Sequence, residues 1–318
     1  MWKSIVIFFF RQAASYLGRN KLSILIYHRV HEVEDPMCPG EVDSNKFNWQ
    51  MELVSKIFTV LPLTDAVQLL RENKLPPRSL CITFDDGYAD NETVALPILQ
   101  RHGLTATFFI ASGYLDDGRM WNDTIIETIR SITAGKLDLT DHGFGVFRLE
   151  SMEDRQNCVQ SLISKLKHLP QEKRLQKTLQ IASLTPKQLP TDLMMTRSQV
   201  KALSDAGMEI GGHTVSHPIL LTLNPDSATK EIHNGKIQLE EITGNPVRTF
   251  AYPNGKPGVD YRMEDVDIVR KLGFECAVST QWGVSSNTTD LYQLKRFTPW
   301  DNAPLRFLMR LMRNYFAT

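Results

Sequence analysis

Short runs of consecutive apolar residues alternate along the chain with longer stretches in which apolar residues recur every three or four positions. The short runs predict buried strands, and the longer stretches predict amphipathic helices. Several helical stretches end at a glycine that leads directly into a short apolar run; these glycines are Gly103, Gly207, Gly244 and Gly273. Glycine is the usual stop signal just past a helix because it readily takes the left-handed conformation. Strands alternating with helices in this way predict parallel strands joined by helical crossovers.

The number of predicted strands favours a barrel. Four strands follow the glycine stops, as "LTATFFI", "MEIGG", "VRTFAY" and "FECAVS". Others are "KLSILIYH", "IFTVLP" and "SLCITF" near the start and "LYQLKRF" near the end. Seven or eight strands separated by helices predict an α/β barrel of the (β/α) kind, regular or distorted, and a doubly wound open sheet is the alternative.

Residues 116–196 interrupt this alternation. They are polar, with helical pieces such as "WNDTIIETIRSI" and "SLISKLKHL", and they predict a helical insertion over one face of the barrel. Met120 and Trp121 are candidates for hydrophobic packing or for stacking on a sugar. The predicted division is an N-terminal helical segment at 1–21 and a barrel at 22–318, interrupted by the insertion at about 116–196.

The N-terminal segment contains one apolar stretch, Ile5 to Phe10, which is too short to span a bilayer. A charge follows it and no small-residue cleavage site comes after, so a cleaved signal peptide is not expected. The segment predicts an amphipathic helix with Phe8, Phe9 and Leu17 packed on the barrel. Packing on a membrane surface is the alternative, which leaves peripheral membrane contact through the N-terminus open.

Charge and cysteine content limit the partners and the cellular compartment that we expect. The 36 basic residues balance the 36 acidic ones, so no net field attracts nucleic acid, and a nucleic-acid partner is not expected. The four cysteines lack CxxC spacing and predict free thiols in a reducing compartment, hence a cytoplasmic location, with peripheral membrane association open. Cys81 and Cys276 lie in apolar runs and are expected to be buried packing residues.

Chemically active side chains recur at the predicted strand ends. "ILIYH" ends at His28, "CITF" leads into Asp85 and Asp86, and "MEIGG" leads into His213. In parallel α/β folds the carboxyl ends of the strands meet at one edge, where catalytic residues gather. The pair Asp85–Asp86 alone is compatible with an acidic turn, a metal site or an acid/base pair.

His213 and His217 are spaced i, i+4, which on one helical turn would direct both imidazoles to a common point. Two histidines and one carboxylate, with a fourth position left open, are typical of a catalytic zinc site. Each motif alone is weak. Their occurrence together at the strand ends of one α/β fold predicts a metal site.

These motifs carry a resemblance to a known family. "TFDDGY" and "GGHTVSHP" resemble the first two signature motifs of the polysaccharide deacetylases, the NodB-like carbohydrate esterases, and "FAYPNG" resembles the third. "YHRV" looks like the opening strand of one branch. The resemblance covers roughly residues 22 to 300, apart from the insertion. It implies a distorted (β/α)7-type barrel, one divalent metal ion, usually zinc, and removal of N-acetyl or sometimes O-acetyl groups from sugars.

The resemblance also implies roles for individual residues. Asp86, His213 and His217 are expected to bind the metal, and Asp85 is expected to be the general base. The backbone N–H of Tyr252 is expected to stabilise the oxyanion. Many family members have an arginine at the position of Ala251 that braces the base, so here the partner of the base is unidentified.

The general acid departs from the family pattern. Family members supply a histidine from a late L-x-x-H motif, but "DLYQLKRFTPWD" contains none. His28 is the expected replacement, because it ends the first strand at the rim and titrates near neutral pH. In the alternative, His28 only hydrogen-bonds a rim loop or Asp85, and Asp85 serves as both base and acid.

The expected function is therefore a metal-dependent hydrolase that removes acetamide groups from an acetylated oligo- or polysaccharide or from a lipid-linked sugar. One alternative is a hydrolase of a small non-sugar amide, which would suit a narrow site roofed by the insertion. The other is a catalytically inactive carbohydrate-binding protein of the same fold. The sequence does not specify the sugar, the linkage or the oligomeric state.

Overall fold

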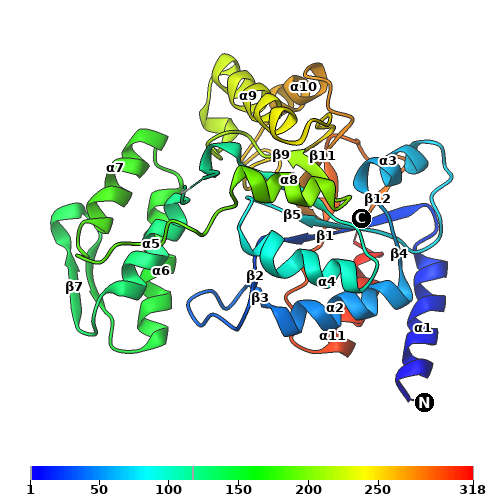
Figure 1. Ribbon diagram of the computed structural model, residues 1–318, viewed down its shortest axis with the longest axis horizontal. Helices are drawn as coiled ribbons and strands as arrows, with labels where there is room; N and C mark the ends of the chain where they lie inside the picture. Colours follow the sequence, from blue (N-terminus) through cyan, green and yellow to red (C-terminus); the bar gives the residue numbers. More distant parts are fainter. Residues whose placement is uncertain (1, 117, 318) are drawn as a thin grey trace.

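A ring of parallel strands forms the centre of the molecule (Figure 1). The computed structural model describes residues 2–116 and 118–317. In sheet order, the strands of the ring are β1 (Lys21–Tyr27), β5 (Ser79–Phe84), β6 (Thr107–Ile110), β9 (Glu209–Gly212), β10 (Thr249–Ala251), β11 (Cys276–Trp282) and β13 (Leu294–Arg296). Phe297, directly after β13, pairs in parallel with Leu25 of β1 and exchanges hydrogen bonds of 2.8 and 3.0 Å with Ile24 and Ile26. The sheet is thus nearly closed, which confirms the expected (β/α)7-type barrel over the open sheet.

The barrel is distorted between β11 and β13. Their pairing shifts register between Val278 and Trp282, and a loop with the short strand β12 (Ser285–Ser286) connects them instead of a helix. β12 pairs antiparallel with β1. The predicted strand "IFTVLP" is reduced to β4 (Thr59–Val60), beside β5. β2 (Val30–His31) and β3 (Val42–Asp43) form a separate pair.

Helices cover the outside of the barrel (Figure 1). They are α2 (Ser44–Ile57), α3 (Leu63–Arg71), α4 (Leu96–Arg101), α8 (Arg197–Asp205), α9 (Pro225–Thr243), α10 (Met263–Lys271) and α11 (Pro304–Asn314). Alternate strand residues face opposite sides of the sheet. Leu25 and Ile82 therefore belong to the large core shared with the outer helices, whereas Ile24 and Cys81 belong to a second cluster with Cys276. Both cysteines are fully buried, as expected.

The N-terminal helix α1 (Trp2–Leu17) packs against α2 and α11. Its buried face carries Ala14 and Leu17, so the expected packing is confirmed for Leu17. The expectation is wrong for Phe8 and Phe9, which are 59% and 68% exposed because they lie on the opposite face of the helix. Within the described part of the chain, no helix is long and apolar enough to cross a bilayer.

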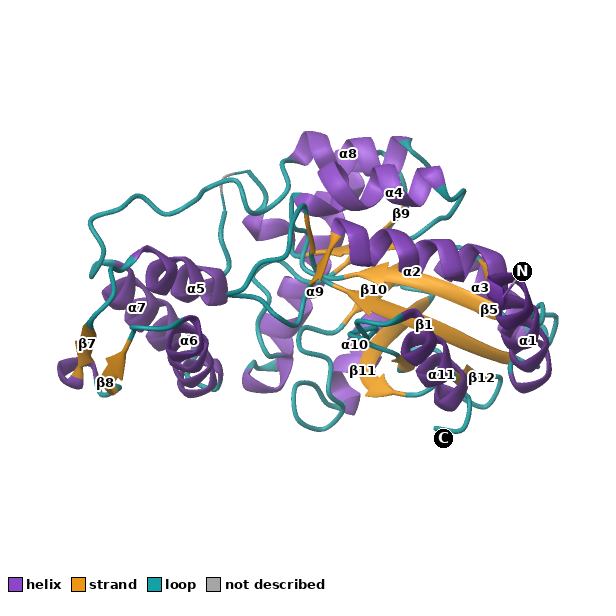
Figure 2. Ribbon diagram, turned by 90° about the horizontal axis from the view of Figure 1, so that it is seen from below, coloured by secondary structure: helices purple, strands orange, loops and turns teal. Residues whose placement is uncertain are grey.

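The insertion forms a body with its own core between β6 and α8. It contains α5 (Trp121–Ser131), α6 (Met152–Lys167), α7 (Gln171–Ala182) and an antiparallel hairpin of β7 (Lys136–Leu139) and β8 (Gly145–Arg148). Buried Ile129, Leu162 and Ile181 hold these elements together. Figure 2 shows the insertion beside the barrel, on the side toward which β1 and β5 point. The chain returns to the rim where Met195 N–H donates to the Gly87 carbonyl at 2.9 Å. The hairpin was not expected from the sequence.

Candidate metal centre and active site

Three of the residues singled out in the sequence come together at the rim of the barrel. Asp86 Oδ1 lies 3.4 Å from His213 Nε2 and 3.3 Å from His217 Nε2. One ligand atom from each residue lies within 4.8 Å of the other two. The Asp86 carboxylate and the two imidazoles therefore surround a common point.

A left-handed turn after β5 separates the two adjacent acids. Asp86 has φ +79° and Gly87 has φ +95°, a region that favours glycine. A Cβ on Gly87 would also lie 3.0 Å from the Ile110 side chain, so both the conformation and the space require glycine here. This turn directs Asp86 to the histidines, while Asp85 points to a different partner.

A loop, and not a helical turn, brings His213 and His217 together. Thr214 and His217 have φ of +66° and +51°, which excludes a helical turn. The expectation that both imidazoles face a common point is confirmed, and the expectation of a helix between them is wrong. The Thr214 hydroxyl accepts a hydrogen bond from His217 N–H at 3.1 Å. A Cβ on Gly235 of α9 would lie 2.9 Å from the Thr214 backbone, so α9 packs directly under the loop.

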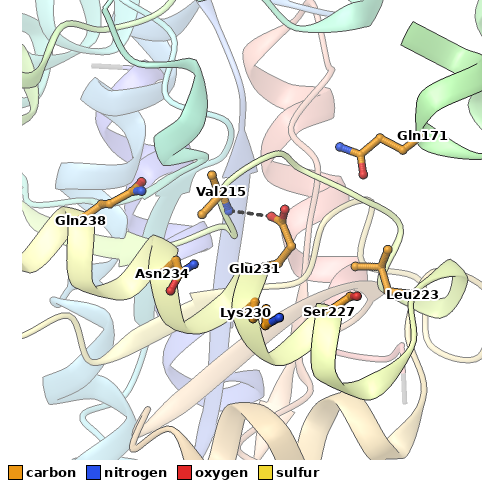
Figure 3. A pocket seen from close by; sticks show the side chains of 8 residues that line it. All are labelled: Gln171, Val215, Leu223, Ser227, Lys230, Glu231, Asn234 and Gln238. Atoms are coloured by element: carbon orange, nitrogen blue, oxygen red, sulfur yellow. Dashed lines mark hydrogen bonds between the residues drawn. The ribbon is translucent and has the colours of Figure 1, made fainter.

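Glu231 of α9 fixes the same loop (Figure 3). Its carboxylate accepts hydrogen bonds from Val215 N–H at 3.0 Å, Ser216 N–H at 2.8 Å and the Ser216 hydroxyl at 2.8 Å. Gln171 of α7 donates to the Ser216 hydroxyl at 2.9 Å, which ties the insertion to the loop. The sequence analysis missed Glu231, and no signal in the sequence distinguishes it from other glutamates on that helix.

The protonation states of this cluster fit a divalent cation. His213 Nδ1 lies 2.7 Å from the Ala251 carbonyl oxygen, which can only accept, so Nδ1 is the protonated nitrogen of the tautomer that offers the Nε2 lone pair to a metal. Burial lowers the pKa of His217 to about 4, against the opposing effect of Asp86, so its imidazole is neutral at pH 7. Burial alone would raise the pKa of Asp86, but His217 and His213 hold it well below its usual range. Two imidazoles that present Nε2 to a common point and one carboxylate are suitable zinc ligands.

Asp85 is paired with Arg296, the last residue of β13. Arg296 Nη1 and Nη2 each donate to one Asp85 oxygen at 2.7 Å, and Arg296 Nε donates to the Ser279 carbonyl at 2.8 Å. Burial raises the pKa of Asp85, but Arg296 and His213 lower it more, so the carboxyl stays ionised. Arg296 is thus the ion-pair partner of Asp85, for which the sequence identified no partner. An arginine at the end of a predicted strand, at the same rim, was the signal that could have found it.

His28 lines the same cavity as the two aspartates and the two histidines. Burial lowers the pKa of His28, but Asp86, Glu41 and Asp85 raise it more, so the net shift is upward. Asn91 donates to the His28 carbonyl, and the ring makes no hydrogen bond with any other residue in 2–116 or 118–317. The ring is thus free to reach a ligand. The hydrogen bond to Asp85, which was part of the alternative considered for His28, is not present.

Tyr252 is not brought to the cavity. Its side chain is fully buried, stacked on Tyr261 with ring centroids 3.8 Å apart, and its N–H donates to the Val278 carbonyl at 3.4 Å. Asn254, two residues later, lines the cavity with φ +60°. Its N–H has no hydrogen-bond partner within the described residues. The sequence analysis missed Asn254, although it lies in the same "FAYPNG" motif.

The cavity has a volume of about 310 Å³ and lies between the barrel rim and the insertion. Residues from the insertion line one part of it, namely Met120, Trp121, Asn122, Ile163, Lys167 and Arg174. Trp121 therefore has a place beside a bound ligand. Met120 is only 2% exposed and packs against Tyr88, which is the hydrophobic packing considered for it.

Comparison with known proteins agrees with this geometry. The sequence profile of the polysaccharide deacetylase family matches residues 72–277, more than half of the chain. YxkH of Bacillus subtilis (strain 168), which is assigned to the polysaccharide deacetylases, is 21% identical over 276 residues, covering 87% of this chain and 70% of YxkH.

Two solved structures share the fold. One is the Streptococcus pyogenes deacetylase PplD in complex with acetate, with a TM-score of 0.63 and 22% identity over 92% of this chain and 98% of PplD. The other is IcaB from Ammonifex degensii, with a TM-score of 0.59 and 18% identity over 93% of this chain and 97% of IcaB. These two structures show a shared fold, and the family profile settles the class of the protein. The chain belongs to the polysaccharide deacetylase family, and it is a metal-dependent hydrolase that removes acetyl groups from glycans.

Proposed function

We propose that this deacetylase hydrolyses the acetamide of an N-acetylated sugar, with Asp86, His213 and His217 holding one zinc ion and Asp85 acting as general base. The observation that carries the proposal is the division of labour between the adjacent acids. Asp86 faces two imidazoles at 3.3–3.4 Å, whereas Asp85 is held by Arg296 at 2.7 Å. One carboxylate is thus available to a cation and the other is kept ionised beside it.

The zinc ion, when bound, supplies Lewis acidity, which lowers the pKa of water and polarises a carbonyl oxygen. Asp85 accepts the proton of the attacking water. Arg296 occupies one lone-pair direction on each Asp85 oxygen, and a carboxylate oxygen has a second one for this proton. The Arg296 pair also orients the carboxylate, so Asp85 needs no rearrangement before it acts.

Negative charge develops on the acetamide oxygen and needs a hydrogen-bond donor in a site that excludes water. The backbone N–H of Asn254 is the donor that we propose, because it has no partner among the described residues and belongs to a residue that lines the cavity. The donor expected from the sequence, Tyr252 N–H, is directed at Val278 and keeps its role only if that 3.4 Å contact opens.

The departing amine must be protonated, or the tetrahedral intermediate reverts. We assign this step to His28, whose ring is free within the described residues and whose pKa is raised. Asp85, once protonated, is the alternative donor.

The test is acetate release from N-acetylated oligosaccharides and lipid-linked sugars by the zinc-loaded protein, with a chelator-treated control. Acetate release that the chelator abolishes is expected. Asp85→Asn should keep its zinc and lose activity about 10²- to 10⁴-fold, as for loss of a general base. His217→Ala should lose its zinc.

Three results would contradict the proposal. Full zinc content in His217→Ala would remove that ligand assignment. Loss of zinc from Asp85→Asn, with zinc retained by Asp86→Asn, would reverse the roles of the two acids. Zinc binding with turnover of small amides alone, or with no turnover of any acetylated sugar, would point to one of the alternatives given by the sequence.

A further inference from the structure

The insertion contributes two cations to the cavity, Arg174 of α7 and Lys167 of α6. Arg174 is only 6% exposed. Within residues 2–116 and 118–317, neither side chain forms an ion pair with any carboxylate. An arginine this deeply buried usually has an acidic partner, since removing a charge from water is costly.

Arg174 is held in place by contacts that leave its charge uncompensated. Its guanidinium lies over the Trp121 ring, 5.1 Å from the centroid, and Nη1 donates to the Lys167 carbonyl at 3.2 Å. Nε and Nη2 have no hydrogen-bond partner within the described residues. Burial lowers the pKa of Arg174, and the opposing influence comes from Tyr114 and not from a carboxylate.

Two arginines at the barrel rim, the half-buried Arg29 and the buried Arg296, behave differently. Arg29 pairs with Asp90 at 2.8 Å, and Arg296 pairs with Asp85 at 2.7 Å. The fold thus supplies a carboxylate to both of these arginines and, within the described residues, none to Arg174. The arginine without a carboxylate partner is the one that lines the cavity from the insertion.

The acids that share the cavity form no ion pair with either cation. Asp85 binds Arg296, Asp86 faces the two histidines, and Glu41 accepts a hydrogen bond from Arg29 N–H at 3.4 Å. None of the cavity-lining residues contributed by the insertion is acidic. The two cations are therefore open to a negatively charged group on a ligand.

We propose that Arg174 and Lys167 form a subsite for an oxyanion, a carboxylate or a phosphate, carried by the acetylated substrate. The inference rests on the proposed function and narrows its substrate class to N-acetylated glycans or glycolipids with an acidic substituent near the acetamide. The planar guanidinium, with two free donors, suits bidentate binding of either group, and the lysine adds a second charge.

The kinetic test compares three substrates of equal size: a neutral N-acetylated disaccharide, its hexuronic acid analogue and its 1-phosphate. With the zinc-loaded full chain, kcat/KM should be at least tenfold higher for one of the anionic substrates, mainly through KM. The substrate that gains this advantage tells carboxylate from phosphate. Arg174→Gln and Lys167→Gln should each lower kcat/KM for that substrate at least tenfold more than for the neutral one.

Lys173→Gln is the matched control, because Lys173 is an exposed cation next to Arg174 that does not line the cavity. It should leave all three kcat/KM values unchanged. Equal losses for neutral and anionic substrates in Arg174→Gln and Lys167→Gln would overturn the subsite, since a structural role would affect both alike.

Binding without turnover separates this inference from the proposed function. Calorimetric titration with glucuronic acid and glucose 1-phosphate, with glucose as the neutral control, should show an affinity that falls at least tenfold in Arg174→Gln and persists in His217→Ala. If no sugar is deacetylated but this affinity is present, the proposed function fails and the subsite stands. The opposite result is acetate release together with an affinity for the two anionic sugars that is the same in the wild type, Arg174→Gln and Lys167→Gln. In that case the subsite is wrong and the function stands.

Discussion

At the scale of single residues, the chemistry depends on which partner each rim side chain meets. Asp85 and Asp86 are chemically identical neighbours, and burial would raise the pKa of both. At Asp85 the bidentate ion pair with Arg296 reverses this effect, and at Asp86 the adjacent His217 and His213 reverse it. Identical residue types can therefore divide two roles because their environments differ.

Arg296→Gln tests the role of this ion pair in the pH dependence of the reaction. A base works only when deprotonated, so activity is lost as the pH falls through the pKa of Asp85, which Arg296 holds below its ordinary value of about 3.9. Without Arg296, burial raises that pKa, so the acidic limb of kcat/KM should move to higher pH. Removing one partner of a buried pair should also destabilise the fold by roughly 3–5 kcal/mol.

Lys295→Gln, at the neighbouring position, is the control for Arg296→Gln. The zinc content has to be measured across the same pH range, because protonation of His213 or His217 also gives an acidic limb. An unchanged acidic limb in Arg296→Gln, with zinc retained, would rule out Asp85 as the group that this arginine keeps ionised.

His28→Gln tests the general acid. An acid works only when protonated, so activity should fall as the pH rises through the His28 pKa, which lies above the ordinary value of about 6.5. The variant should lose this alkaline limb and slow about 10²-fold or more, with zinc content unchanged. Near-normal rates with an intact alkaline limb would transfer the role to Asp85.

At the scale of elements, loops carry the site and neighbouring helices hold the loops. The loop from His213 to His217 contains two residues with left-handed backbone conformations, which cost energy unless surrounding contacts enforce them. Helix α9 provides those contacts through Glu231 and through the close approach at Gly235. The spacing of the two imidazoles is therefore a property of a loop and a helix together.

Glu231→Ala should loosen this loop without touching the metal ligands. It removes three hydrogen bonds to a carboxylate, and each such bond is worth about 1.5–3 kcal/mol. We expect unfolding stability to fall by about 2–4 kcal/mol and zinc affinity to fall at least tenfold, measured by denaturation and by competition with a chelating dye. Glu241→Ala, an exposed position on the same helix, should change neither. Wild-type zinc affinity in Glu231→Ala would show that the loop holds its shape unaided.

At the scale of the whole molecule, the site lies where three separate parts of the chain meet. β5 supplies the acids, the loop after β9 supplies the histidines, and β13 returns at the end of the chain with Arg296. Closure of the barrel between Phe297 and Leu25 holds Arg296 in position. The insertion then covers the rim and adds Trp121, Lys167 and Arg174 to the cavity.

Metal removal tests whether an ion bound at this site stabilises the folded protein. An ion that binds only the folded state stabilises it by about 2.7 kcal/mol when present at a hundred times its dissociation constant. Chelation should therefore lower the thermal midpoint by several degrees, and excess zinc should restore it. His217→Ala should melt at the same temperature with and without chelator. A chelator effect that persists in this variant would place the stabilising metal elsewhere in the protein.

The sequence by itself determined the class of fold and the metal-binding chemistry. Apolar runs alternating with glycine-terminated helices specify parallel strands, because hydrophobic periodicity and backbone preferences are local properties. Asp85, Asp86, His213 and His217 were found because each follows a predicted strand, and parallel strands bring their ends together.

Only the tertiary structure decided which residues complete the site. Arg296 is 211 positions from Asp85, and Glu231 holds a loop from a neighbouring helix. Asn254 lines the cavity in place of Tyr252 because β10 ends at Ala251 and the turn that follows exposes a different residue. The cationic wall formed by Lys167 and Arg174 depends on how the insertion docks on the barrel. These contacts join residues far apart in sequence, and local patterns of polarity carry no information about such pairs.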